Sequence, residues 1–142
     1  SNDEKQRLAL TLQGFVQVGA LDVQSAVSMH RFWRAYGQAG VDACLLAMAD
    51  HLGTRGVALN QNEWVLFLER IQTLLAAYYT RYDQIVAPPV LVDGDALISA
   101  LDLKPGRQIG QLLDAIREAQ VEGRVTSAEE ALKFAAARLR DD

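Results

Sequence analysis

The segment 103–110 (LKPGRQIG) contains the residue types in this chain that best suit binding chemistry. Pro105 is expected at the first position of a helix, where its missing amide hydrogen costs no hydrogen bond. The backbone amides of Gly106 and Arg107 would then point outward at the positive end of the helix dipole, with the cation of Lys104 nearby. Amides and cations in this arrangement suit a phosphate group, so the segment predicts a docking point for a sugar-phosphate chain.

Three further residues extend this candidate site. Gly110, one helical turn later, would keep the helix face narrow, either for close approach of a nucleic-acid backbone or for packing against another helix. Arg117 and Arg124 add cations suited to forked contacts with phosphate, although acids are interspersed among them, so helix geometry must decide whether a basic face exists. The predicted RNA-binding residues are Lys104, Gly106, Arg107, Gly110, Arg117 and Arg124.

A second candidate for chemistry is the pair Asp50 and His51, because carboxylate and imidazole both bind divalent ions. Neighbours in a helix point about 100° apart, so the two side chains cannot both reach one ion on an unbroken helix. The chain also has no H-E-x-x-H motif, no glycine-rich phosphate loop and no G-x-S-x-G motif. We therefore interpret Asp50 and His51 as polar residues at a helix end and predict neither a catalytic nor a metal-binding set.

Two other potential sites have simpler structural interpretations. Asp93 and Asp95 have the spacing of magnesium-binding carboxylates, but they flank Gly94 at an expected helix start, where helix capping is the favoured interpretation. Cys44, the single cysteine, lies in an apolar helical stretch and is predicted to be a small buried side chain rather than a nucleophile.

The composition is that of a globular protein, with 142 residues, 50% of them hydrophobic and 23% charged. The net charge of −4 counts against a nucleic-acid partner, whereas eleven of the fourteen cations being arginine favours phosphate contacts. No apolar run approaches the roughly 20 residues of a membrane helix, and no signal peptide follows Ser1, so a cytoplasmic location is expected. The absence of an initial methionine suggests a removed tag or a segment of a longer chain.

The elements that must position these residues are all predicted to be helices, because apolar residues recur at spacings of three and four. We expect an all-α protein, a helical bundle of about seven helices in two packed subdomains, 1–86 and 87–142, divided where prolines follow Ala87. In the first subdomain Leu8, Leu12, Phe15 and Val16 mark one helix, which is expected to end near Gly14 to Gly19. A second helix is expected to be capped by Asp22 and ended by Gly37 as a left-handed cap.

The rest of that subdomain is predicted to contain two more helices. One helix, 41–52, should be the most buried, with Leu45, Met48, Ala49 and Leu52 on its core face. The other follows an N-cap at Asn60 and runs to about Asp83. The second subdomain should hold an Asp93-capped helix to Leu101, a helix from Pro105 to Glu122 ended by Gly123, and a last helix opened by a Thr126–Glu129 capping box.

The order of several short patterns resembles bacterial proteins of the tRNA nucleotidyltransferase/poly(A) polymerase family. The first patterns, at 30–34 (HRFWR), 37–43 (GQAGVDA) and 45–52 (LLAMADHL), resemble the end of that family's HD-type region. The later ones resemble its C-terminal region: 88–89 (PP), 93–97 (DGDAL), 101–106 (LDLKPG), 109–113 (IGQLL), 117–120 (REAQ), Gly123 and 126–132 (TSAEEAL). The likeness extends from about residue 28 to 135.

The resemblance implies a C-terminal, non-catalytic tRNA-binding fragment. A nucleotidyltransferase head, absent from this chain, would add nucleotides to the tRNA 3′ end with Mg²⁺ and CTP or ATP, while these helices bind the tRNA backbone. Asp50 matches only the final aspartate of the HD pattern, so phosphohydrolase activity is not carried over. Arg107 stands where the family usually has a small residue, which adds charge and leaves the helix start intact.

The sequence leaves two alternative functions open. A helical protein-interaction or dimerisation module without RNA binding would agree with the acidic charge and would expose an apolar patch. A metal-dependent phosphohydrolase of the HD type would need more ligands than Asp50 and His51 provide.

Overall fold

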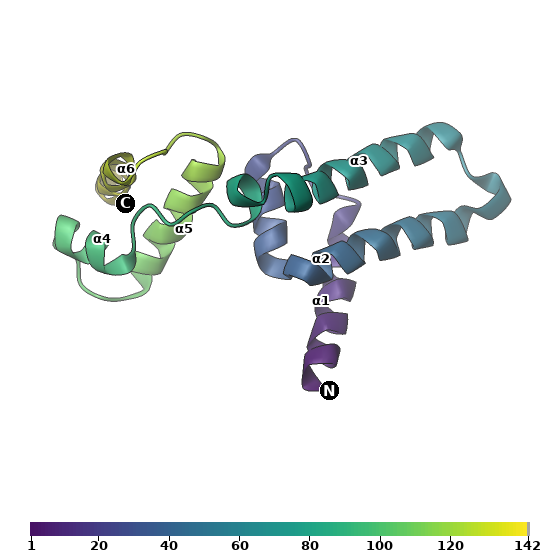
Figure 1. Cartoon of the computed structure of the whole chain (residues 1–142), viewed down its shortest axis with the longest axis horizontal. Helices are drawn as coiled ribbons and strands as arrows, with labels where there is room; N and C mark the ends of the chain where they lie inside the picture. Colours follow the sequence, from purple (N-terminus) through teal and green to yellow (C-terminus); the bar gives the residue numbers. More distant parts are fainter. Residues whose placement is uncertain (142) are drawn as a thin grey trace. The chain divides into compact units, whose positions relative to one another are not determined.

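The computed structural model describes residues 1–141 and confirms the all-α prediction (Figure 1). The chain divides into two compact units, unit 1 (Ser1–Ala87) and unit 2 (Pro88–Asp142). The α-helices in the described part are α1 (Asn2–Val18), α2 (Ala26–Arg55), α3 (Gln61–Thr80), α4 (Gly94–Leu101), α5 (Arg107–Val121) and α6 (Ala128–Asp141). Two short turns complete them, the 3-10 turn η1 (Gly56–Ala58) and the π-helical turn η2 (Tyr82–Val86).

The start of α2 differs from the prediction. Ser25, not Asp22, is the N-cap, and its hydroxyl accepts a hydrogen bond from the Ser28 amide at 3.2 Å. Asp22 instead accepts from the Gln24 amide at 3.0 Å within the preceding turn. An aspartate can stabilise a tight turn or a helix start equally well, which explains the error.

Gly37 bends α2 rather than ending it. Its φ of 47° and ψ of −127° are non-helical, lie in a region that favours glycine and differ from those of a left-handed cap, so the predicted cap at Gly37 is wrong. The helix resumes immediately afterwards, so the predicted second and third helices form one bent element (Figure 1). When the two halves of α2 are counted separately, residues 1–141 contain seven α-helices, which is about the number expected.

The predicted core face of the second half of α2 is wrong. Leu45 and Leu52 are 51% and 44% exposed, whereas the helix face that carries small side chains, including Ala43 and Ala47, is buried. The reason is close packing of α1 on α2: a Cβ added to Gly14 of α1 would lie only 3.1 Å from the Ala43 Cβ. Small residues permit this approach, and a row of leucines would hold the helices apart.

The prediction for Cys44 is confirmed, because its side chain is fully buried on this helix. Burial raises the pKa of the Cys44 thiol to about 12. The thiol therefore remains protonated at neutral pH, which is the state of a packing residue rather than a nucleophile.

Helix α3 begins as predicted and ends differently. The Asn60 side chain accepts hydrogen bonds from the amides of Asn62 and Glu63, at 3.0 and 3.2 Å. The α-helix stops at Thr80, and the following residues form η2, so the predicted end at Asp83 is corrected. A 2.7 Å hydrogen bond between His30 Nδ1 of α2 and the Ile85 carbonyl ties this π turn to the core.

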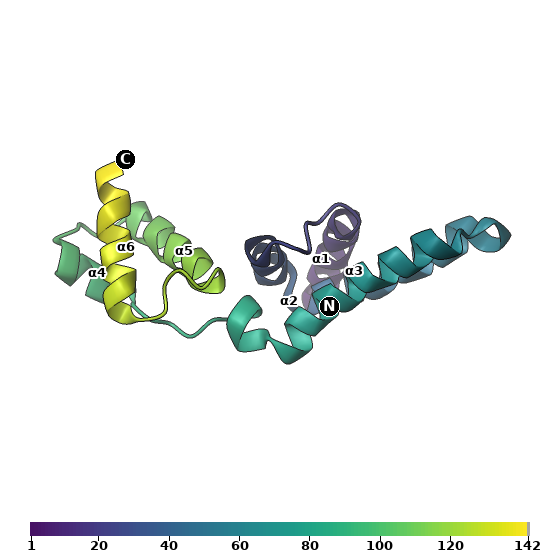
Figure 2. The same cartoon turned by 90° about the horizontal axis from the view of Figure 1, so that it is seen from above.

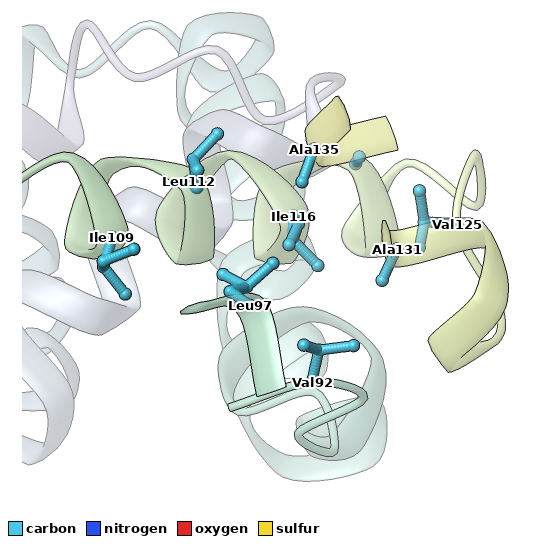
Figure 3. Packing of buried hydrophobic residues seen from close by; sticks show 9 residues of the cluster. Val92, Leu97, Ile109, Leu112, Ile116, Val125, Ala131 and Ala135 are labelled. Carbon is cyan, nitrogen blue, oxygen red and sulfur yellow. The ribbon is translucent and has the colours of Figure 1, made fainter. Parts of the chain in front are cut away.

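Unit 2 is a three-helix domain with its own hydrophobic core. Leu97 of α4 is fully buried and lies against the α5 face that carries Ile109 and Ile116 (Figure 3). α6 packs on both α4 and α5 (Figure 2) and contributes Ala131 and Ala135. The apolar spacing at positions 109, 112 and 116 of α5 follows one helix face, so this core was predicted from the sequence.

The caps of unit 2 explain how its helices are placed. Asp93 caps α4 as predicted by accepting from the Ala96 amide at 2.8 Å. Gly123, with φ of 75°, ends α5, which is also confirmed. The last cap is one residue later than predicted: Ser127 accepts from the Glu130 amide at 3.2 Å, and the Glu130 carboxylate binds Thr126.

Among the described residues, no helix combines the length and the apolar composition that crossing a bilayer requires.

Candidate nucleic-acid interface

The start of α5 is an exposed helix N-terminus without a side-chain cap. Gly106 is the N-cap, with φ of 163° and ψ of −172°, and it has no side chain that could accept a hydrogen bond from the first turn. Pro105 therefore precedes the cap and is not the first helical residue, which corrects the prediction by two positions. The outward-facing amides shift accordingly to Arg107 and Gln108, because the Ile109 amide donates to the Gly106 carbonyl at 3.1 Å.

The side chains around this helix start are accessible. Lys104 and Arg107 are exposed, and neither forms an ion pair within residues 1–141. A Cβ added to Gly106 or to Gly110 would meet no atom within 4 Å. The turn is therefore open to a ligand, and packing within this chain does not require glycine at position 110.

Arg117 and Arg124 do not join the other predicted residues at the start of α5. Arg117 is ten residues after Arg107, which corresponds to a rise of about 15 Å along α5. It pairs with Asp114 at 3.3 Å, and Arg124 pairs with Glu122 through a 2.6 Å hydrogen bond. Internal acids thus compensate both cations, and four of the six predicted residues remain together at the helix start.

A cation that the sequence analysis missed lies near this helix start. A cleft of about 420 Å³ separates the beginning of α5 from the end of α6. Its lining residues are Gln108, Gln111, Leu112, Arg138 and Leu139. Two helices joined by a short loop run antiparallel, so the short connection 122–127 was the signal that could have placed Arg138 beside Gln108.

Local charge at the start of α5 differs from that of its neighbours. The first turns of α4 and α6 carry acids, including Asp95, Glu129 and Glu130, which complement the helix dipole. The first turn of α5 carries no acid. No acidic side chain in the first turn of α5 therefore complements its dipole, and the nearest preceding acid is Asp102, the C-cap of α4.

Asp50 and His51 do not form a site together. Asp50 is exposed, whereas His51 is buried with its ring stacked on Phe67 at a centroid distance of 4.6 Å. His51 lies near the end of α2, as interpreted, and its buried ring belongs to the aromatic packing between α2 and α3. Across residues 1–141 no three histidine, cysteine, aspartate or glutamate side chains are grouped so that they could hold a metal ion.

The fold and the site together define a class of protein. It is all-α, and the start of α5 is open, is flanked by cations and has the chemistry that suits a phosphate-bearing ligand. Comparison with known proteins gives the family. A family model for tRNA nucleotidyltransferase domain 2 matches residues 58–136. The chain belongs to this family, and the matched range includes α3 and the candidate interface.

Individual relatives agree with this assignment. The A-adding tRNA nucleotidyltransferase of Deinococcus radiodurans is 30% identical over 93% of this chain. CC-adding tRNA nucleotidyltransferases of Thermus thermophilus and Synechocystis sp. are 33% and 40% identical over 66% and 44% of the chain. The matches cover 29%, 19% and 15% of those three relatives, in that order, so the chain spans less than a third of each. No solved structure matches the chain.

Proposed function

We propose that this chain is a non-catalytic tRNA-binding region, which positions tRNA for nucleotide addition by a nucleotidyltransferase head on the same parent polypeptide. The observation that carries the proposal is the start of α5, where Lys104 and Arg107 flank free backbone amides without an internal ion-pair partner in the described chain. Backbone amides and cations of this kind position a sugar-phosphate chain without reading its sequence.

The net negative charge of the chain is compatible with this function. Contact with phosphate depends on the local field within about one Debye length, which is roughly 8 Å at physiological salt. Within unit 2, acids in the first turns of α4 and α6 and the partners of Arg117 and Arg124 lie elsewhere than the open helix start. One acid, the exposed α4 C-cap Asp102, lies two residues before Lys104. The two cations Lys104 and Arg107 therefore outnumber the one nearby acid where the ligand would bind.

The head, its Mg²⁺ and its CTP or ATP are part of the same proposal, as is a cytoplasmic location. The names of the relatives describe the addition of A or CC to tRNA, and the chain covers under a third of each of them. In this proposal the chemistry resides in the head, and the residues of this chain bind and orient the tRNA backbone.

A surface of unit 1 favours a second candidate function, protein interaction. Of the twelve large hydrophobic side chains that are exposed in the described part, eleven lie in unit 1 and only Val90 lies in unit 2. They include Leu8, Leu12 and Val16, which follow one stripe of α1. We propose that the head covers this surface; dimerisation is the alternative, which light scattering of the purified chain over a range of concentrations tests.

The RNA-binding proposal is tested by reversing the two cations. Lys104→Glu with Arg107→Glu should weaken binding of a tRNA transcript and should leave the helical circular dichroism spectrum unchanged, because both side chains are exposed. The slope of log affinity against log salt should fall by roughly 1.5, since about two phosphate contacts are lost. A matched control is Lys5→Glu with Arg55→Glu, which changes the net charge equally in unit 1. Equal affinity of the two double variants would exclude the α5 start as the interface.

A further inference from the structure

The cleft between α5 and α6 is lined mainly by polar side chains, together with two leucines. Leu112 and Leu139 contribute the apolar part, and Leu112 is only 4% exposed because it also packs into the core of unit 2. Gln108, Gln111 and Arg138 contribute the polar part from two different helices. These three side chains are exposed and have no hydrogen-bond or ion-pair partner among residues 1–140, whose side chains the structure describes.

A phosphate group would use only part of this chemistry. It accepts hydrogen bonds and cannot donate them, so it would engage the amide donors of Gln108 and Gln111 and the guanidinium of Arg138, and it would leave the two carboxamide oxygens to solvent. The cleft therefore offers hydrogen-bond acceptors and apolar contacts that a phosphate does not use.

A nucleobase matches each part of the cleft. Its flat face is apolar and can lie on leucine side chains, and its edge carries both donors and acceptors. A carboxamide pairs with the N6 and N7 edge of adenine through one donor and one acceptor, and a guanidinium can stack on a base or bind its edge. The volume of about 420 Å³ is within the range of small-ligand pockets.

We infer that the cleft formed by Gln108, Gln111 and Arg138 receives one unpaired purine base of the bound RNA, with adenine the better fit to two carboxamides. This inference rests on the proposed RNA-binding function and adds selectivity to it. The start of α5 holds the backbone, and the cleft, one helical turn away, discriminates among the bases that follow. Salt concentration should change the affinity that comes from contacts with the RNA backbone, and base identity should change the affinity that comes from the cleft.

The test compares short oligoadenylate and oligocytidylate RNAs of equal length by fluorescence anisotropy. The chain should bind oligoadenylate about fivefold or more tightly than oligocytidylate. Gln108→Ala with Gln111→Ala should remove this preference. Arg138→Lys retains the charge and should likewise reduce the preference, because the planar fork is lost. Gln61→Ala, at an exposed glutamine of unit 1, is the control.

The outcomes separate the inference from the function on which it rests. Binding of both oligomers with equal affinity would overturn the base-binding cleft and leave backbone binding in place. A preference that survives the double glutamine substitution would assign selectivity to another part of the chain and would also overturn the inference. Failure to bind either oligomer or tRNA would contradict both proposals. Circular dichroism of each variant verifies that the helices are intact.

Discussion

Replacing Gly110 by alanine should raise stability and lower RNA affinity at the same time. Gly110 lies inside α5, is exposed, and would have no neighbour within 4 Å of an added Cβ. Alanine restricts the unfolded chain and favours the helix by about 1 kcal/mol relative to glycine, and no clash offsets this gain. The expected increase in the free energy of unfolding is therefore about 0.5–1 kcal/mol.

The same methyl group should obstruct a bound backbone. Position 110 shares one side of α5 with Arg107 and Arg117, at spacings of three and seven residues. A sugar-phosphate chain held at the start of α5 would approach the bare backbone there, and a side chain would hold it away. A loss of about 1 kcal/mol of contact corresponds to about fivefold weaker binding.

The assays are urea unfolding followed by circular dichroism and filter binding of a tRNA transcript. The matched control is Gly53→Ala in α2, where an added Cβ also meets nothing within 4 Å. Gly53→Ala should give a similar gain in stability without a change in RNA affinity. Unchanged RNA affinity of Gly110→Ala would remove that position from the interface, and a loss of stability would refute the conclusion that its surroundings are open.

Other predictions concern packing and titration. Gly40→Ala should lower the free energy of unfolding by roughly 1 kcal/mol, measured by tryptophan fluorescence in urea, because the new Cβ would lie 2.9 Å from the buried Trp33 ring and helix propensity offsets only part of this cost; an unchanged or higher midpoint would contradict it. Hydrogen bonds from Thr126 lower the pKa of Glu130, so this carboxylate stabilises the fold above its ordinary pKa of 4.5 and loses that effect as pH falls through the lowered pKa. The difference in urea midpoint between the natural chain and Glu130→Ala should therefore shrink under acid, and a constant difference would argue against the ionised form. The Cys44 thiol, with its raised pKa, should react with a thiol reagent only after unfolding, and rapid labelling of the folded chain would disprove its burial.

Much of the helical framework follows from local chemistry. Asn60 and Asp93 cap the helices that the spacing predicts, because an N-cap side chain needs only the amides of the next turn. Gly123 adopts the positive φ expected where a helix ends. Errors of one to three residues occur where neighbouring residues offer equivalent caps, as at Ser25 and Ser127.

The candidate interface was only partly predictable. Lys104, Gly106 and Arg107 adjoin in sequence, so a helix start alone brings them together. Whether Arg117 is available depends on the rotamer that joins it to Asp114, and the proximity of Arg138 to Gln108 depends on how α6 packs on α5. Side-chain conformation and helix packing bring these residues together, so the distances between them do not follow from their positions in the sequence.

By itself the sequence determined the all-helical class, several helix limits and the segment whose amides and cations suit phosphate, because these depend on propensities and hydrogen bonds within a turn or two. The tertiary structure alone decided that α2 buries its alanines and leaves Leu45 and Leu52 exposed, and that a cleft opens beside the start of α5. The physical reason is that burial and clefts arise from close packing between helices. Several faces of one helix can satisfy the same apolar pattern until a neighbour's shape selects one.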